Sequence, residues 1–261
     1  MRATFTFLGS GTSRGVPMIG CDCEGCRSAD PRDHRYRTSG LVTVDDRRIL
    51  IDCGPELRLQ LLRAKVDSLD AVLLTHSHAD HLNGIDDLTG VTMRMRQPLP
   101  FYAAPATLAI VQSRFDYIDR LRHRPDGTLR WSVPQLEFHA VTGPFETAGI
   151  AVTPLPIYHG DALICGWRIG GLAYLCDCSR IPDETYPLLD GVTDVVLDAL
   201  RWKPHPTHFS IEQANAEVAR IRPRHAWYTH LCHDILYARD QPLMLPDVTL
   251  AYDTLTFPFE I

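Results

Sequence analysis

The sequence predicts a layered α/β fold, because short apolar runs typical of strands recur along the whole chain and helical patterns separate some of them. The composition shows no linker, repeat or long charge block that would divide the chain. With 261 residues, the protein is long enough to bury one large hydrophobic core. We therefore expect residues 1–261 to form a single domain in which strands and helices make a sandwich.

The strand-like runs lie at residues 3–8, 41–44, 48–51, 70–74, 149–157, 164–169, 172–175, 193–197 and 225–229. Helical patterns lie at residues 55–64, 104–118 and 211–222, and the last follows a capping box in which Ser210 precedes Gln213 by three residues. The glycine-rich residues 9–15 lack the Gly-Lys-Ser/Thr ending of a P-loop, so we interpret them as a tight turn that lines the active site. The basic, turn-rich residues 120–131 are expected to form a surface loop.

The most informative segment is the septet Thr-His-Ser-His-Ala-Asp-His at residues 75–81. It follows the apolar run 71–74, so His76, His78, Asp80 and His81 stand where a buried strand ends and the chain turns toward a helix. Imidazole nitrogen suits zinc, manganese and iron, whereas carboxylate oxygen suits harder cations and can bridge two of them. The alternative is a histidine-rich polar turn, and this density of ligand-type residues favours a metal site over it.

Three later residues extend this pattern, because each comes directly after a predicted strand. They are His159, Asp177 and His230. A single histidine in such a place is more often structural than a ligand. Together with the septet, however, the three residues indicate a site large enough for two ions.

The septet resembles the HxHxDH signature of the metallo-β-lactamase superfamily, whose members mostly hydrolyse esters, thioesters, lactams or phosphodiesters. The resemblance implies an αββα sandwich and two divalent ions, manganese or zinc. It implies that His76, His78 and His159 hold one ion, that Asp80, His81 and His230 hold the other, that Asp177 bridges them, and that Asp52 orients the histidines. Two ions about 3.5–4 Å apart can share a hydroxide that attacks the substrate. The resemblance also implies a catalytic role for Asp80 beside its role as a metal ligand.

A second metal site is predicted from sulfur ligands. Cys21, Cys23 and Cys26 form a CxCxxC cluster, and three thiolates at this spacing need a fourth ligand around one zinc ion. We assign His233 as that ligand of a structural zinc. A disulfide with one free thiol, or three unrelated cysteines, are the alternatives, and a disulfide is disfavoured without a sign of an oxidising compartment. The other cysteines (Cys53, Cys165, Cys176, Cys178 and Cys232) are expected to be small buried apolar residues.

The cysteine cluster, the septet and the His-x-x-His at 230–233 together resemble the PhnP family of phosphodiesterases from bacterial phosphonate breakdown. The resemblance implies hydrolysis of 5-phosphoribosyl 1,2-cyclic phosphate to ribose 1,5-bisphosphate. His208, on the loop before the helix at 211–222, is expected to protonate the leaving oxygen, because a positioned histidine is the usual donor. No role is assigned to the remaining histidines, His34, His123, His139, His205 and His225.

Three other functions fit the sequence less well than hydrolysis of a small phosphodiester. Ribonuclease Z has a long tRNA-binding arm between the ligands matching His159 and Asp177, where this chain has only seventeen residues. The net charge of −6 and pI of about 6.0 also argue against nucleic acid as a partner. A PqqB-like cofactor-biosynthesis role, or a non-catalytic binding protein, fits less well because the ligand set looks complete. We expect a cytoplasmic enzyme with a small-molecule phosphodiester substrate and no membrane span, and a homodimer is compatible with the sequence.

Overall fold

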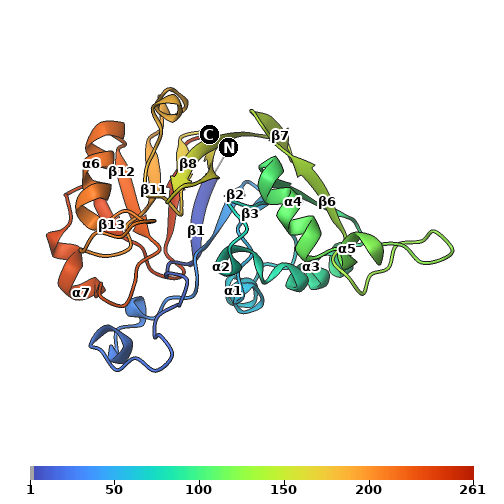
Figure 1. Cartoon of the computed structure of the whole chain (residues 1–261), viewed down its shortest axis with the longest axis horizontal. Coiled ribbons are helices and arrows are strands. Elements are labelled where there is room, and N and C mark those ends of the chain that lie inside the picture. The colour runs from blue at the N-terminus through green and yellow to red at the C-terminus, as the bar shows by residue number, and fades with distance from the viewer. Residues whose placement is uncertain (1–2) are drawn as a thin grey trace.

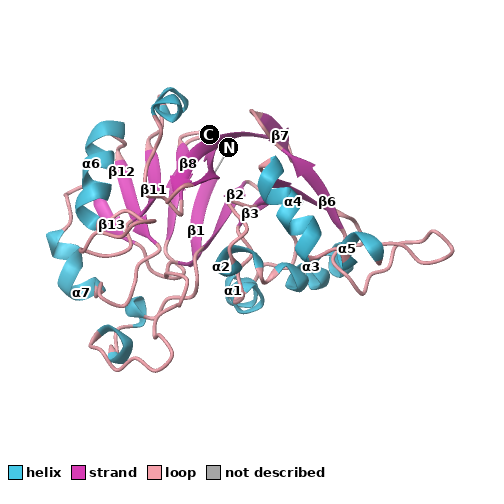
Figure 2. Cartoon of the chain, in the orientation of Figure 1, coloured by secondary structure: helices cyan, strands magenta, loops and turns pink. Residues whose placement is uncertain are grey.

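The computed structural model describes residues 3–261 as two seven-stranded β-sheets that pack face to face, with helices on their outer faces (Figures 1 and 2). Alternation along the strands divides the apolar side chains between three cores. In the strand at 47–51, Ile49 and Ile51 enter the core between the sheets, whereas Leu50 enters the core beneath the neighbouring helices. The predicted αββα sandwich is confirmed.

The first sheet has the strand order β14-β1-β2-β3-β4-β5-β6. Its strands β3 to β6 run parallel, which places their carboxyl ends at one edge. The bounds are β1 (Ala3–Gly9), β2 (Ser39–Val44), β3 (Arg47–Ile51), β4 (Ala71–Leu73), β5 (Leu99–Ala103), β6 (Leu136–Ala140) and β14 (Thr256–Phe259).

The second sheet has the order β13-β12-β11-β10-β9-β8-β7. Strands β10 to β13 are parallel, and β9 is antiparallel to both of its neighbours. The bounds are β7 (Phe145–Thr147), β8 (Ile150–His159), β9 (Ala162–Ile169), β10 (Leu172–Leu175), β11 (Asp194–Asp198), β12 (His225–Thr229) and β13 (Val248–Leu250).

Helices near the first sheet are α1 (Leu57–Ala64), α2 (Ala79–Leu82), α3 (Leu88–Met95), α4 (Pro105–Arg114) and α5 (Tyr117–Arg120). The second sheet is covered by α6 (Ile211–Ile221), with α7 (Tyr237–Asp240) nearby (Figure 1). Short 3-10 helices span Gly25–Arg27, Pro31–Asp33, Ile85–Asp87, Asp183–Leu189 and Gln241–Leu243.

Most predicted elements are present within a few residues of their predicted ends. The capping box of α6 is confirmed, since Ser210 N donates to Gln213 Oε1 at 2.9 Å and Gln213 N donates to Ser210 Oγ at 3.3 Å. The predicted helix at 104–118 was wrong in one respect, because α4 ends at Arg114 and a separate turn, α5, follows. Residues 120–131 are largely exposed turns, as expected of a surface loop. In residues 3–261, no helix combines the length and the apolar character that crossing a bilayer requires.

Candidate active site

Strand ends from both sheets meet at one edge of the sandwich. In the first sheet, β3 ends beside Asp52 and β4 ends just before the septet at 75–81. In the second sheet, His159 is the last residue of β8, while Asp177 follows β10 and His230 follows β12. Strands β8, β10 and β12 point the same way, because β9 is antiparallel to both β8 and β10. Ligand-type side chains that are remote in sequence therefore converge.

The seven residues predicted to bind metal form two groups that share Asp177. Within each group, the ligand atoms of all four residues lie within 4.8 Å of one another. The first group is His76, His78, His159 and Asp177, and the second is Asp80, His81, Asp177 and His230. Asp177 Oδ2 lies 3.8 Å from His76 Nε2, whereas its Oδ1 lies 3.2 Å from His81 Nε2 and 3.3 Å from His230 Nε2. The carboxylate thus faces both groups, which is the position of a bridging ligand.

Several nitrogens in these groups have no hydrogen-bond partner among residues 3–261. They are Nε2 of His76, Nε2 of His81 and both ring nitrogens of His230, all of them buried. A buried polar atom without a partner is costly, and such atoms in native proteins call for an explanation. Coordination of cations would satisfy them, so the residues fit a pair of divalent ions.

The opposite ring nitrogens are held by the surrounding protein. Asp52 Oδ2 lies 2.6 Å from His81 Nδ1, and the carboxylate also accepts from Thr75 N at 2.8 Å. The carbonyl oxygen of Thr207 lies 2.7 Å from His159 Nδ1 and must accept its proton. Partners of this kind fix the tautomer and direct Nε2 inward, as around metal-binding histidines. Asp52 therefore lies behind the histidines, in contact with the ring of His81.

A close backbone approach explains the glycine that follows this aspartate. A Cβ atom on Gly54 would lie 2.1 Å from the carbonyl oxygen of Asp80. The turn after β3 consequently packs directly on the septet helix α2, and Cys53 N donates to His81 O at 2.7 Å. Any side chain at position 54 would push Asp80 and His81 away from the site.

Buried charges in the site also match cations. Asp80 and Asp177 are 8% and 2% exposed, and Asp52 is fully buried. Burial would raise the pKa of Asp177, but the imidazoles of His230 and His81 hold it well below its usual range. Burial, with the charge of His81, lowers the pKa of His76 well below its usual value, which leaves His76 in the neutral form that binds metal. Bound cations would compensate these buried carboxylates.

His208 is held by a carboxylate that the sequence analysis did not single out. Asp198, the last residue of β11, is fully buried, and its Oδ2 accepts the Nδ1–H of His208 at 2.6 Å. Burial opposes a charge on His208, but Asp198 raises the pKa of this ring to about 9. The ring of His208 stacks on His230 at 4.6 Å between centroids, so a protonated imidazole lies beside the predicted metal ligands. The same rule that found the other strand-end ligands would have found Asp198.

The cysteine cluster assembles as predicted, with His233 as its fourth member. The Nδ1 atom of His233 lies 3.2 Å from the sulfurs of Cys21 and Cys23 and 3.6 Å from that of Cys26. These separations approach the value of about 3.6 Å expected around tetrahedral zinc. A hydrogen bond from the Cys26 amide lowers the pKa of the Cys23 thiol to about 7, whereas burial raises that of Cys26 to about 11. The geometry suits one zinc ion, and none of the cysteines is in a disulfide among the described residues.

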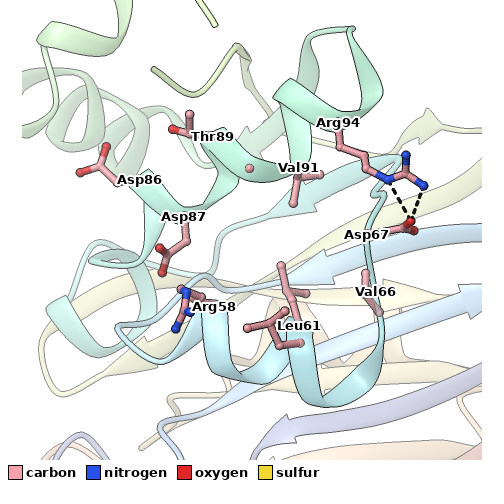
Figure 3. Close-up of a pocket in the computed structure, with 11 residues that line it drawn as sticks. Arg58, Leu61, Val66, Asp67, Asp86, Asp87, Thr89, Val91 and Arg94 are labelled. Carbon is pink, nitrogen blue, oxygen red and sulfur yellow. Dashed lines mark hydrogen bonds and ion pairs between the residues drawn. The ribbon is translucent and has the colours of Figure 1, made fainter. Parts of the chain in front are cut away.

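The cysteines outside the cluster are buried, as predicted: Cys53, Cys165, Cys176, Cys178 and Cys232. Two cavities flank His205. One, of about 200 Å³, is lined by the turn at 12–15, His205, His208 and His233. The other, of about 700 Å³, is lined by His78, His159, Arg180 and again His205. A third cavity lies between α1 and α3 (Figure 3), where its Arg94–Asp67 ion pair is drawn, and it contains none of the predicted metal ligands.

Comparison with known proteins supports this interpretation. Residues 47–231 match the family described as "Beta-lactamase superfamily domain". The chain belongs to the metallo-β-lactamase superfamily. A solved structure of a diphosphatase from the PhnP family is 38% identical, covers 100% of this chain and 98% of its own, and has a TM-score of 0.92.

Two curated relatives bear other names. An octanoyltransferase from Porphyromonas gingivalis is 41% identical over 253 residues, which are 95% of this chain and 50% of that protein. A ribonuclease Z from Bradyrhizobium diazoefficiens is 33% identical over 144 residues, 52% of this chain and 45% of that protein. The chain spans about half the length of these curated relatives. Together with the paired His/Asp groups, the comparisons support a metal-dependent hydrolase.

Proposed function

We propose that this protein is a metal-dependent phosphodiesterase that hydrolyses a small cyclic phosphodiester such as 5-phosphoribosyl 1,2-cyclic phosphate. Residues 1–261 would act as one domain in the cytoplasm, with manganese or zinc in the paired site and a structural zinc at the cysteine cluster. The two groups sharing Asp177 would hold the paired ions. When bound, such ions supply a nucleophile at neutral pH and stabilise the charge that develops on the phosphoryl oxygens.

The observation that carries the proposal is the hydrogen bond between His208 and Asp198 beside the metal-ligand groups. An alkoxide is a poor leaving group, so cleavage of an alkyl phosphodiester needs a proton at the departing oxygen. Because Asp198 accepts from Nδ1, the Nε2–H of His208 is the group free to donate that proton. Asp198 positions the ring and stabilises its charge without touching the substrate.

The PhnP-family neighbour supports a phosphoryl substrate, since it is 38% identical along the whole chain. Its name, diphosphatase, also favours a second candidate, hydrolysis of the anhydride bond of a diphosphate. A departing phosphate needs much less protonation than an alkoxide, and a buried histidine held protonated would contribute less to that reaction. For this reason we place the cyclic phosphodiester first.

Ribonuclease Z is the alternative with the least support from the site. Only seventeen residues separate His159 from Asp177, and they form the β8–β9 turn, β9 and β10 without any projecting arm. The octanoyltransferase relative is about twice as long as its match with this chain, so its name does not assign acyl transfer to this half.

The test is a comparison of substrates with the purified protein and added manganese or zinc. The panel contains 5-phosphoribosyl 1,2-cyclic phosphate, bis(p-nitrophenyl) phosphate and a dinucleoside diphosphate, whose two phosphates are joined by an anhydride bond. The proposal predicts the highest kcat/KM for the cyclic phosphodiester, with product analysis showing ribose 1,5-bisphosphate. Preferential cleavage of the diphosphate would favour the second candidate, and no turnover of any member with metal-loaded protein would refute both.

A further inference from the structure

The smaller of the two cavities beside His205 is lined by positively charged side chains. Its lining comes from three segments: residues 12–15 with Met18, the loop residues Leu200, Arg201, His205 and His208, and residues 232–234. Arg14 and Arg201 contribute positive charge, and Asp234 is the carboxylate of the lining. The cavity extends from the metal-ligand groups toward the cysteine cluster, since His208 and His233 both line it.

The turn that carries Arg14 is firmly held. Thr12 N donates to Leu231 O at 3.2 Å, Gly15 N donates to Thr12 O at 2.8 Å, and Arg37 Nε donates to Ser13 O at 2.8 Å. The side chain of Arg14 is exposed, and among residues 3–261 its guanidinium has no carboxylate within ion-pair distance. The protein thus fixes the backbone and leaves a cation at the cavity wall available for an anion.

His205 faces the same cavity with a defined hydrogen-bond donor. Its Nδ1 lies 3.4 Å from Thr207 N and 3.2 Å from Thr207 Oγ1. A backbone amide can only donate, so these contacts assign Nδ1 as the acceptor and place the proton on Nε2. Arg201 holds the same loop, because it donates to the carbonyls of Lys203 at 3.2 Å and Pro204 at 3.1 Å. The Nε2–H of His205 is therefore a positioned donor beside His208.

We propose that this cavity binds a second phosphoryl group of the substrate, a phosphate monoester distinct from the scissile diester, with Arg14 and His205 as its ligands. The inference rests on the proposed function and names a substrate class: small phosphodiesters that carry a terminal phosphate. Guanidinium pairs with phosphate through two parallel hydrogen bonds, and an imidazole N–H adds a third.

Cavity size supports a terminal phosphate over a larger group. The volume of about 200 Å³ is below the range of roughly 300–1,000 Å³ that drug-sized ligands occupy. The cavity on the other side of His205 is wider, about 700 Å³, and its one arginine, Arg180, stacks on the Tyr158 ring at 3.7 Å. Each cavity contains one carboxylate, Asp161 in the wider and Asp234 in the smaller, but the smaller has two arginines and the wider has one, which makes the wider cavity the poorer site for a dianion.

The experiment compares kcat/KM for 5-phosphoribosyl 1,2-cyclic phosphate with kcat/KM for ribose 1,2-cyclic phosphate, which lacks the terminal phosphate. Both are measured for the metal-loaded wild type, Arg14→Met and Arg14→Lys. Arg58→Met is the matched control, because Arg58 is an exposed arginine lining the remote cavity of Figure 3. Thermal melting and metal content establish that each variant is folded and loaded.

Wild type should prefer the phosphorylated substrate, and Arg14→Met should lower kcat/KM for it by about 10- to 100-fold through KM, as loss of a charged hydrogen bond does. Hydrolysis of ribose 1,2-cyclic phosphate should be nearly unchanged. Arg14→Lys should lose less than Arg14→Met, because an ammonium keeps the positive charge although it cannot form the two parallel hydrogen bonds of a guanidinium. His205→Leu should reduce the same preference, and His205→Gln, which keeps a donor, should restore some of it.

Three results would overturn the inference. Equal losses on both substrates in Arg14→Met would give Arg14 a general structural role. A wild type that cleaves both substrates with the same kcat/KM would remove the phosphate subsite and leave the phosphodiesterase intact. A metal-loaded wild type that cleaves neither substrate would refute the proposed function and the subsite together.

Discussion

Replacing Asp198 with asparagine tests whether the buried carboxylate keeps His208 protonated. The side chain is fully buried, and its Oδ2 accepts from His208 Nδ1 at 2.6 Å and from Cys178 N at 2.8 Å. Despite burial, which opposes the charge, Asp198 raises the pKa of His208 from 6.5 to about 9. This difference corresponds to a preference for the charged ring of about 3 kcal/mol.

The pH dependence follows from the direction of that change. A histidine whose pKa is raised keeps its proton up to about pH 9 and loses it above, so about 90% of wild-type His208 is protonated at pH 8. Asparagine is neutral, so the pKa of His208 should fall to 6.5 or below, which leaves about 3% protonated at pH 8. Bound cations would lower the pKa of His208 in both proteins, so both titrations would move to lower pH while that of the variant stays below that of wild type.

We expect kcat/KM of Asp198→Asn for a cyclic alkyl phosphodiester to fall about thirtyfold at pH 8, and the loss to shrink as the pH is lowered. With bis(p-nitrophenyl) phosphate, whose leaving group departs without a proton, the two proteins should differ little at any pH. The assay is a pH–rate profile with both substrates, with metal content measured alongside. A loss of the same size at every pH and with both substrates would refute the argument, since it would mean that Asp198 supports the metal site or the fold.

Three further predictions concern the donor, the cysteine cluster and the metals. His208→Ala should keep its metals and slow hydrolysis of alkyl phosphodiesters by about 10²–10⁴-fold; unchanged rates would remove His208 from the mechanism. Cys23→Ser should lose one zinc per chain and melt at a lower temperature, because zinc binding contributes to folding; normal melting with lost turnover would instead place the cluster in the chemistry. Elemental analysis of protein purified without chelator should find three ions per chain, and chelation should lower the melting temperature, whereas one ion or none would contradict the two-site assignment.

The convergence of the candidate metal ligands could be predicted because the signal for each residue is local. Parallel strands end at one edge of a sheet, so a ligand-type residue just past an apolar run marks that edge without knowledge of the strand order. His159, Asp177 and His230 follow this rule and meet in the structure. Asp198 follows it too, directly after Val195-Val196-Leu197, but its role depends on a contact with His208 that no spacing reveals.

The sequence analysis did not predict β14, β5 or α3, because residues that disfavour strands or helices interrupt their patterns. Pro258 interrupts β14, which is tolerated because β14 pairs only with β1 at the margin of its sheet. Pro100 stands in β5, where only Phe101 and Tyr102 are paired with β4, so its missing N–H falls outside that ladder. Helix α3 contains Gly90 and two threonines, which weaken its helical propensity, and packing of Leu88 and Val91 into the core stabilises it instead.

The end of one strand carries residues of both proposed metal sites, and the structure explains why these residues are close in sequence. His230 and His233 stand on the same turn after β12, in which His230 adopts a φ of 59°. A Cβ on Gly25 would lie 2.1 Å from His233 O, so the cysteine cluster packs directly on this turn. Leu231 N donates to Ser10 O at 3.0 Å, which ties the turn to the segment that carries Arg14. Loss of the ion at the cysteine cluster should therefore loosen a metal ligand and the proposed phosphate subsite before it affects the sheets, because both depend on the backbone of residues 230–233.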